Sequence, residues 1–441
     1  MKNLINCLLV LALLPVVPQS VTAQVRVLRL DEVIDLGLAN SKSLQISSAK
    51  AAAAQAKTAQ THDATFPTVS YNGSYARLSE NIDPFAITLP SGETQVLNPV
   101  IPNQYLNRLS ITEPVFTGLR ALNTIRATEF LEQAARFDLE RDRKDVQLNL
   151  TAAAINLYKL QSALKVVDKN LTTAQNRLTD TYHLRDQGLA LDNDVLRSEL
   201  AVTQLETAKL ETANAIAAAQ FNLAILLGLP TEQGIQIDSA SLFSGAESAE
   251  SLDFFLGNAA NRADVQAADQ RALAASKQVK ITQGTYFPLI SVGANLYTNR
   301  PNQRLFPPQD RFLSTWDAGV NVSWNLSNFY TSRHTVQESK LNFLQAELQR
   351  SQLGDAAKSD IANNFYNWQT ARQKTLLAEK SVAQALENQR ITQLRNTQQI
   401  ASLSDLLDAD ALLVQAQINE VGARADARMA YFKLLKSAGK L

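Results

Sequence analysis

The sequence predicts a mainly helical protein with a small membrane β-barrel part, built from two copies of one mixed unit of strands and very long helices. Three observations predict it: an ordered internal duplication, long stretches without glycine or proline, and runs of alternating apolar and polar residues ahead of each long stretch. The repeated unit is far too long for a small solenoid repeat.

The duplication consists of five fragments that recur in the same order about 210 to 220 residues further along. They are 66–70 with 287–291, 109–112 with 320–323, 156–158 with 364–366, 194–196 with 405–407, and 220–223 with 431–434. We therefore expect a first structural repeat over 24–228, an inter-repeat linker or equatorial segment over 229–253, and a second repeat over 254–441.

Residues 1–23 have the layout of a secretory signal peptide: Lys2, an apolar stretch, and Ala23 ahead of Gln24. The single cysteine, Cys7, lies inside this segment, so its removal would exclude disulfides and thiolate chemistry. No unbroken run of 18 apolar residues follows, and helical membrane spans are not expected. The formal net charge is zero, and no basic patch with aromatic residues indicates nucleic acid.

The helices are predicted from the placement of glycine and proline. Both are absent from 119–187 and again from 189–227, and in 320–421 the only glycine is Gly354. We expect a helical hairpin in each repeat, over 119–227 and 330–438, with arms on the order of 100 Å long. Apolar residues from 146 to 178 follow the 4, 3, 4, 3 spacing of a coiled coil, and a similar stripe runs from 403 to 425.

The strands are predicted ahead of each hairpin, as pairs within 66–114 and 287–325. Residues 290–297 and 318–325 alternate between apolar and small or polar side chains. That alternation suits a strand between lipid and a watery lumen, although on pattern alone a half-buried strand of a soluble sheet is the commoner source. Trp316, Trp324 and Tyr297 could form an interfacial aromatic belt.

Four strands cannot close a barrel, because an open edge in hydrocarbon leaves backbone groups unpaired at several kcal/mol each. Helices much longer than a domain likewise cannot bury their apolar stripes on a single core. Both arguments predict that the chain oligomerises.

The motifs together resemble the TolC-like outer-membrane factors, the exit ducts of Gram-negative tripartite efflux pumps and type I secretion systems. The resemblance is carried by the opening segment 30–41, the Phe-Pro pairs at 66–67 and 287–288, Glu-Pro-Val-Phe-Thr-Gly at 113–118, Tyr158, Gly188 ahead of Asp194, and Leu-Leu-Gly at 226–228. It implies a homotrimer in the outer membrane, with a twelve-stranded barrel, four strands from each chain, continuous with a long α-helical periplasmic barrel. Its implied partners are outer-membrane lipid, a periplasmic adaptor protein and an inner-membrane transporter.

The candidate functional residues lie at the hairpin tips. Asp405 and Asp408 share one helical face, and the resemblance implies that they and Asp194 surround the periplasmic aperture. Ser402 and Asp405 also have the spacing of a capping box, which is a purely structural alternative. The tip residues are Arg185, Gly188 and Gln399. The second tip lacks the family's glycine, which puts the family's gate-locking contacts in doubt here.

No arrangement of residues indicates catalysis, a cofactor or a metal site: His62, His183 and His334 are isolated, and methionine occurs twice. The alternative function is an exported, envelope-anchored coiled-coil structural protein or adhesin without channel activity. Long heptads fit that alternative, but it does not explain why alternating strands precede both hairpins.

Overall fold

The structure is a computed structural model that describes residues 26–79, 81–244 and 250–441, so the expected signal peptide over 1–23 lies outside the described residues. The described chain forms two compact units. One unit contains the described parts of Met1–Ser41, Gln147–Glu247 and Trp368–Phe432; the other contains those of Lys42–Val146, Ser248–Asn367 and Lys433–Leu441.

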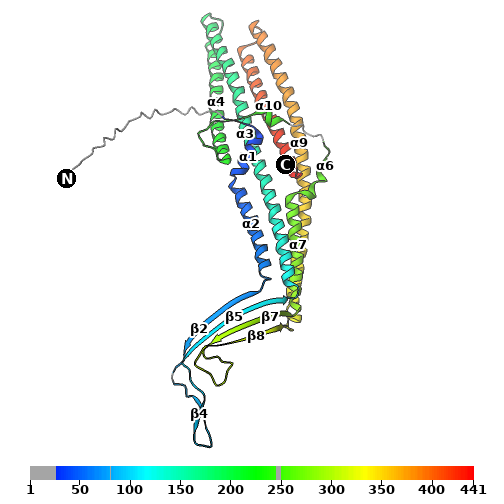
Figure 1. The fold of residues 1–441 in the computed structure, drawn as a ribbon. Coiled ribbons are helices and arrows are strands. Elements are labelled where there is room, and N and C mark those ends of the chain that lie inside the picture. The colour runs from blue at the N-terminus through cyan, green and yellow to red at the C-terminus, as the bar shows by residue number, and fades with distance from the viewer. Residues whose placement is uncertain (1–25, 80, 245–249) are drawn as a thin grey trace, which may run out of the picture. The chain divides into compact units, whose positions relative to one another are not determined.

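The elements agree with the prediction of a mainly helical chain that carries four long strands (Figure 1). The helices are α1 (Leu30–Asn40), α2 (Lys42–Asp63), α3 (Arg120–Asp186), α4 (Asp192–Leu227), α5 (Ser239–Phe243), α6 (Leu252–Leu256), α7 (Ala263–Gln283), α8 (Asn328–Thr331), α9 (Arg333–Thr397) and α10 (Leu403–Ser437), with 3₁₀ turns at Ala259–Asn261 and Gly284–Tyr286. The strands are β1 (Arg26–Leu28), β2 (Thr68–Arg77), β3 (Phe85–Thr88), β4 (Thr94–Asn98), β5 (Asn103–Phe116), β6 (Ile235–Ile237), β7 (Leu289–Asn299) and β8 (Leu313–Ser323).

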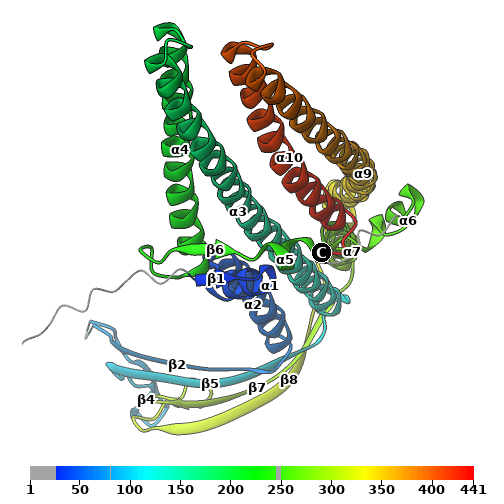
Figure 2. The same ribbon diagram turned by 90° about the horizontal axis from the view of Figure 1, so that it is seen from above.

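Four strands form one antiparallel sheet in the order β2-β5-β7-β8 (Figure 2). The β5–β7 pair joins the two predicted strand pairs, with Leu109 opposite Leu296 and Ile111 opposite Ala294. Strands β3 and β4 form a separate hairpin inside the β2–β5 connection. Within the described sheet β2 and β8 are edges, each paired on one side only.

The strand register sorts the side chains of this sheet onto two chemically different faces. One face is largely apolar and includes Val69, Tyr71, Leu109, Ile111, Ile290, Val292, Ala294, Leu296, Trp316, Ala318, Val320 and Val322. The charged Glu113, opposite Val292, also lies on this face. The other is largely polar and comprises Thr68, Ser70, Asn72, Ser74, Arg108, Ser110, Thr112, Ser291, Gly293, Asn295, Tyr297, Thr315, Asp317, Gly319, Asn321 and Ser323.

The expectation that Tyr297 joins the tryptophans in one belt was wrong. Tyr297 lies opposite Thr315 on the polar face, whereas Trp316 lies opposite Leu296 on the apolar face. Since side chains alternate along a strand, neighbours in sequence point to opposite faces. Tyr75, Tyr105 and Phe312, with ring centroids 4.9 and 5.5 Å apart, instead gather near the loop end of the sheet.

The junction between β5 and α3 depends on a close backbone approach. Gly118 has φ 65°, and a Cβ at this position would lie 2.4 Å from the carbonyl oxygen of Gly284. Both the conformation and the contact require glycine. The Glu-Pro-Val-Phe-Thr-Gly motif therefore ends where strand geometry gives way to a helix.

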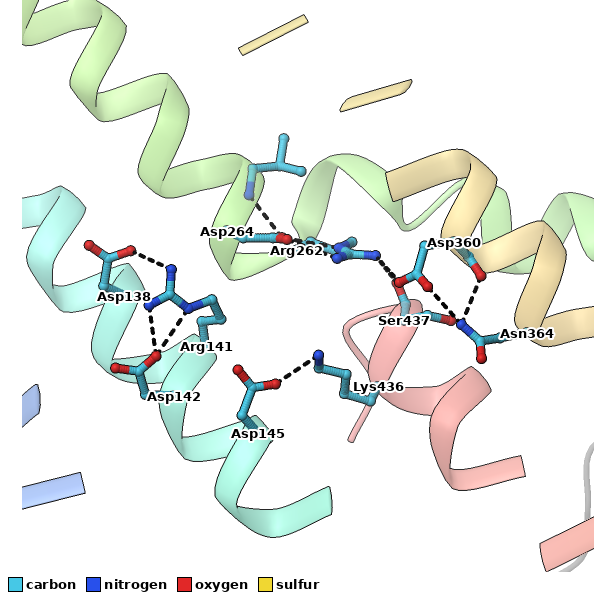
Figure 3. A network of polar contacts seen from close by, with 11 residues as sticks. Asp138, Arg141, Asp142, Asp145, Arg262, Asp264, Asp360, Asn364, Lys436 and Ser437 are labelled. Carbon is cyan, nitrogen blue, oxygen red and sulfur yellow. Dashed lines mark hydrogen bonds and ion pairs between the residues drawn. The ribbon is translucent and has the colours of Figure 1, made fainter. Parts of the chain in front are cut away.

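A network of ion pairs joins α3, α7, α9 and the end of α10 inside the strand-bearing unit (Figure 3). Arg262 contacts Asp264 through Nε and Nη2 at 3.0 and 2.8 Å, and donates from Nη1 to Asp360 at 2.8 Å and to the Ser437 carbonyl at 3.2 Å. Burial opposes ionisation of Asp264, but the hydrogen bonds and charge of Arg262 hold its pKa below the ordinary value.

The same network fixes the C-terminal residues. Lys436 pairs with Asp145 at 2.7 Å, and Lys144 donates to the carbonyl of Gly439 at 2.9 Å. The Lys440 ammonium lies 3.4 Å from the centroid of the Phe254 ring. These contacts bind segments that are far apart in the sequence into one unit.

The other unit has its core where α1, α3, α4 and the parallel β1–β6 pair meet. Its fully buried apolar residues include Leu28, Val33, Leu157, Leu223, Leu227, Ile235 and Leu242. The predicted stripe on α3 is buried or half-buried throughout. On α10 the predicted stripe was wrong in its first half, because Leu406, Ala409 and Leu413 are buried whereas Leu407 and Val414 are half-buried and Ala411 is exposed. Ala425, at the end of the stripe, is buried as predicted.

Candidate functional site

The first helical tip, between α3 and α4, closes with a left-handed glycine. Gly188 has φ 73°, its N–H donates to the Arg185 carbonyl at 2.8 Å, and Leu189 N–H donates to the Leu184 carbonyl at 2.8 Å. This pair of bonds is a Schellman motif, which satisfies the last carbonyls of a helix. Three residues later, the Leu191 N–H donates to the Asp194 carboxylate at 3.0 Å and begins α4.

The second tip, between α9 and α10, closes in the same way without a glycine. Gln399 has φ 60°, its N–H donates to the Asn396 carbonyl at 2.9 Å, and Ile400 N–H donates to the Arg395 carbonyl at 2.8 Å. A residue with a Cβ in this conformation costs about 1 kcal/mol. The backbone of the tip is therefore kept, although the sequence departs from the expected glycine.

Asp405 makes the capping interactions that its spacing from Ser402 suggested. Its carboxylate accepts the Ser402 N–H at 3.0 Å and the Ser402 hydroxyl at 2.7 Å, and the Ser402 hydroxyl oxygen accepts the Asp405 N–H at 3.2 Å. The hydrogen bonds from Ser402 lower the pKa of Asp405. Its carboxylate remains exposed, so a charge role stays compatible with capping.

Asp408 lies one turn beyond Asp405 and is also exposed, while Leu406 and Ala409 between and beside them are buried. Asp408 occupies the place that Arg197 holds in the first hairpin, three residues after the capping aspartate. Arg197 donates from Nη1 to the Ser404 hydroxyl at 2.6 Å and so connects the two tips. Arg185 instead pairs with its neighbour Asp186 at 2.7 Å and stays within the first tip.

Sequence reasoning missed a second connection between the hairpins. Arg177 Nε on α3 lies 2.9 Å from Asp410 Oδ2 on α10, and Gln389 on α9 donates to Asp410 at 3.2 Å. Burial raises the pKa of Asp410, and the charge of Arg177 and the hydrogen bond from Gln389 oppose the rise only in part. The contact partners lie 21 and 233 residues apart, so no local pattern could have indicated them.

Helix α4 exposes an unusually apolar surface. It holds an 18-residue window of mean hydropathy 1.3, of which 17% is buried, so by length and composition it could cross a membrane. The sequence has no unbroken apolar run there because Glu211, Thr212, Asn214, Gln220 and Asn222 interrupt the alanines and leucines. Leu210, Phe221 and Ile225 are all at least half exposed.

Among residues 26–79, 81–244 and 250–441, no group of three or more histidine, cysteine, aspartate or glutamate side chains could hold a metal ion. The carboxylates at the tips are spread along two hairpins. Within one chain they do not make a coordination site.

Comparisons with known proteins match this architecture. Residues 258–440 match the family described as outer membrane efflux protein. The probable efflux pump outer membrane protein TtgC of Pseudomonas putida is 23% identical over 433 residues, which cover 93% of this chain and 82% of that protein. The family match therefore covers most of the second predicted repeat, and the likeness to TtgC extends over most of the chain.

Two further comparisons set the extent of the likeness to this outer membrane efflux family. The toxin and drug export protein A of Aggregatibacter actinomycetemcomitans is 22% identical over 68% of this chain, and the match spans 64% of that protein, less than two thirds of its length. The solved structure of CusC superposes with a TM-score of 0.79 at 15% identity, covering 93% of this chain and 92% of CusC. The latter likeness establishes the four-stranded, mainly helical fold.

Proposed function

We propose that this chain is one of three identical subunits of a passive outer-membrane channel, the exit duct of a tripartite efflux pump or type I secretion system. The observation that carries the proposal is the sheet with one apolar face, one polar face and two edges. An apolar face suits lipid, and a polar face suits a wet lumen. Edges in hydrocarbon must be paired, so β2 of one subunit would pair with β8 of the next.

The helices support the same proposal. The apolar side chains exposed on α4 would be covered by neighbouring subunits, as in other bundles of long helices. With four strands per chain, a barrel could close symmetrically from two subunits with eight strands or from three with twelve. The family resemblance favours three subunits and twelve strands. Trp316 on the apolar face of β8 and Trp324, the residue directly after β8, lie eight residues apart and would mark the two edges of an apolar band roughly 25 Å tall.

The channel would be completed by a periplasmic adaptor protein and an energised inner-membrane transporter. TtgC of Pseudomonas putida is named as an efflux pump component, and the Aggregatibacter protein is named for toxin and drug export. The alternative, an envelope-anchored structural protein or adhesin, does not explain why one face of the sheet is polar while the other is apolar. We therefore favour the channel.

The decisive experiment uses the protein purified in detergent. We expect a trimer that dissociates only on heating in denaturing detergent, and stepwise ion conductance in planar bilayers. A monomer in detergent, or a trimer that fails to conduct, would remove the channel proposal and favour the structural alternative.

Within that channel we propose that Asp405 and Asp408, with Asp194 nearby, surround the periplasmic aperture. Six carboxylates from Asp405 and Asp408 of three chains would attract cations. Asp408→Asn is the clean test, because Asp408 has no part in the capping box. We expect weaker block by a divalent cation and unchanged thermal stability.

A matched control is Asp426→Asn, which removes a carboxylate that lies on the same helix and pairs with Lys159. The aperture assignment is excluded if divalent block is the same in the wild type, Asp408→Asn and Asp426→Asn.

A further inference from the structure

Charge on the polar face of the sheet is confined to one place. Among the described strand residues on that face, the charged side chains are Arg108 on β5 and Asp317 on β8. The remaining positions carry mostly serine, threonine, asparagine or glycine. A field inside the proposed lumen would therefore originate at this level of the sheet.

The two charges belong to one hydrogen-bonded cluster. Arg108 donates from Nε and Nη2 to the Asn295 side-chain oxygen at 3.0 and 2.9 Å, and Asn295 donates to Asp317 at 2.6 Å. Arg304, from the β7–β8 loop, pairs with the same Asp317. The cluster thus holds two guanidinium groups against one carboxylate.

Tyr297 provides a common surface for both arginines. The guanidinium carbon of Arg304 lies 4.3 Å from the centroid of the Tyr297 ring, and that of Arg108 lies 5.7 Å from it. Cation–π contacts of this kind orient a guanidinium without neutralising it. Each chain therefore keeps a net charge of +1 at this level.

The loop that carries Arg304 is held in place by its own contacts. Asn302 is 1% exposed, donates to the Leu313 carbonyl at 2.9 Å and accepts the Arg304 N–H at 3.0 Å. Arg300 is fixed to Asp310 by two hydrogen bonds of 2.7 and 3.1 Å. Arg304 is thereby positioned over the polar face before any solute arrives.

We propose that Arg108 and Arg304 of three chains form an anion-selecting ring in the outer half of the lumen, positioned by Asn295, Tyr297 and Asp317. Solutes that carry carboxylate, sulfonate or phosphate groups would be favoured there. The inference rests on the proposed channel function, since only a closed barrel makes the polar face a lumen. Low-dielectric walls focus the field of three net positive charges on the passing solute.

The ring would have the opposite sign to the carboxylates proposed at the periplasmic aperture. The proposed lumen would therefore be acidic at its entrance and basic near its exit, so no ion would meet attractive charges along its whole length. Conduction requires that binding at each site stays weak enough for release.

The test is made in planar bilayers with the full trimer inserted from one side. The reversal potential is measured in a KCl gradient, and citrate, a trivalent organic anion, is then added to the loop side. For Arg108→Gln/Arg304→Gln we expect the chloride-to-potassium permeability ratio to fall roughly threefold and the half-blocking citrate concentration to rise at least about fivefold. Asp317→Asn should shift both values the other way.

The matched control is Arg311→Gln, because Arg311 lies in the same loop and hydrogen-bonds only to Gln309 among the contacts of its side chain that the structure describes. If the double variant does not assemble, Asp317→Asn tests the proposal alone: a higher chloride-to-potassium permeability ratio and a lower half-blocking citrate concentration support it, and the opposite changes overturn it. Open channels whose selectivity and citrate block are unchanged in all variants would overturn the anion ring and leave the channel intact. A wild-type trimer that conducts no ions would instead overturn the channel function itself.

Discussion

Replacing Arg262 with alanine should loosen the segments that meet in the network of Figure 3. The side chain of Arg262 is 13% exposed and that of Asp264 is 20% exposed, so their pair is largely removed from water. Asp360 is 46% exposed and would recover water readily. The loss therefore depends mainly on Asp264, which would be left as a half-buried, unpaired carboxylate.

The magnitude follows from that burial. Removing one partner of a buried ion pair costs 3 to 5 kcal/mol, and the residual exposure of Asp264 puts Arg262→Ala near the lower end, at about 3 kcal/mol. Adding Asp264→Ala removes the orphan charge, so the double variant should recover about 1 to 2 kcal/mol. Arg390 and Glu387 make an equally bidentate pair at 59% and 55% exposure, and Arg390→Ala should have no measurable effect on stability because water screens this pair.

The assay is amide hydrogen exchange of the trimer in detergent, read in peptides from 259–266 and 433–440. A loss of about 3 kcal/mol corresponds to roughly 100-fold faster exchange from locally opened states. The pKa of Asp264 is lowered in the folded state, so its contribution is complete above the unfolded pKa and is lost as the pH falls through the folded pKa. The difference between wild type and Arg262→Ala should therefore shrink below about pH 3.9.

Equal exchange in Arg262→Ala and Arg390→Ala would refute the argument from burial. A double variant no better than Arg262→Ala would refute the claim that the unpaired carboxylate causes the loss.

Three further outcomes are expected. Gln399→Gly should stabilise the second tip by about 0.5 kcal/mol, because glycine relieves the left-handed strain but also adds conformational freedom to the unfolded chain. The measurement is slower amide exchange of residues 394–402. Gly118→Ala should sharply reduce the yield of folded trimer, because its Cβ would meet a backbone oxygen, whereas Gly319→Ala has nothing within 4 Å and should not. Asp410→Asn should remove a pH dependence of amide exchange in α10. Because the pKa of Asp410 is raised in the folded state, its ionisation costs stability as the pH rises from the unfolded to the folded pKa. Over that interval the wild type should therefore lose protection relative to the variant.

The sequence was sufficient for features that repeat or alternate. The gaps between glycines and prolines predicted two helical hairpins, and α3, α4, α9 and α10 occupy them. The alternation in 290–297 and 318–325 predicted two-faced strands, and the pairing of Val292 with Val320 places equivalent residues on one face. Such patterns report the local period of the backbone, which is fixed by the residues within a few positions.

Contacts between distant segments could not be predicted in this way. Arg262 reaches Asp360 and Ser437, 98 and 175 residues away, and nothing in the neighbourhood of residue 262 sets it apart from other arginines. Tyr297 lies on the polar face because its position in the strand alternation, and not its aromatic character, decides which face it occupies. On α10 a coiled-coil stripe could be drawn in two adjacent registers, and only packing decided between Leu406 and Leu407.

The two tips show how a duplicated backbone can acquire different chemistry at each copy. Asp194 follows Gly188 by six positions and Asp405 follows Gln399 by six, so in both tips a left-handed residue is followed by an aspartate that caps the next helix. Three residues further on, one copy carries Arg197 and the other Asp408. The caps fix where each helix begins, so the charge at the next turn is free to differ without a change of fold. As a result Arg197 holds the neighbouring hairpin through Ser404, whereas Asp408 stays exposed to solvent.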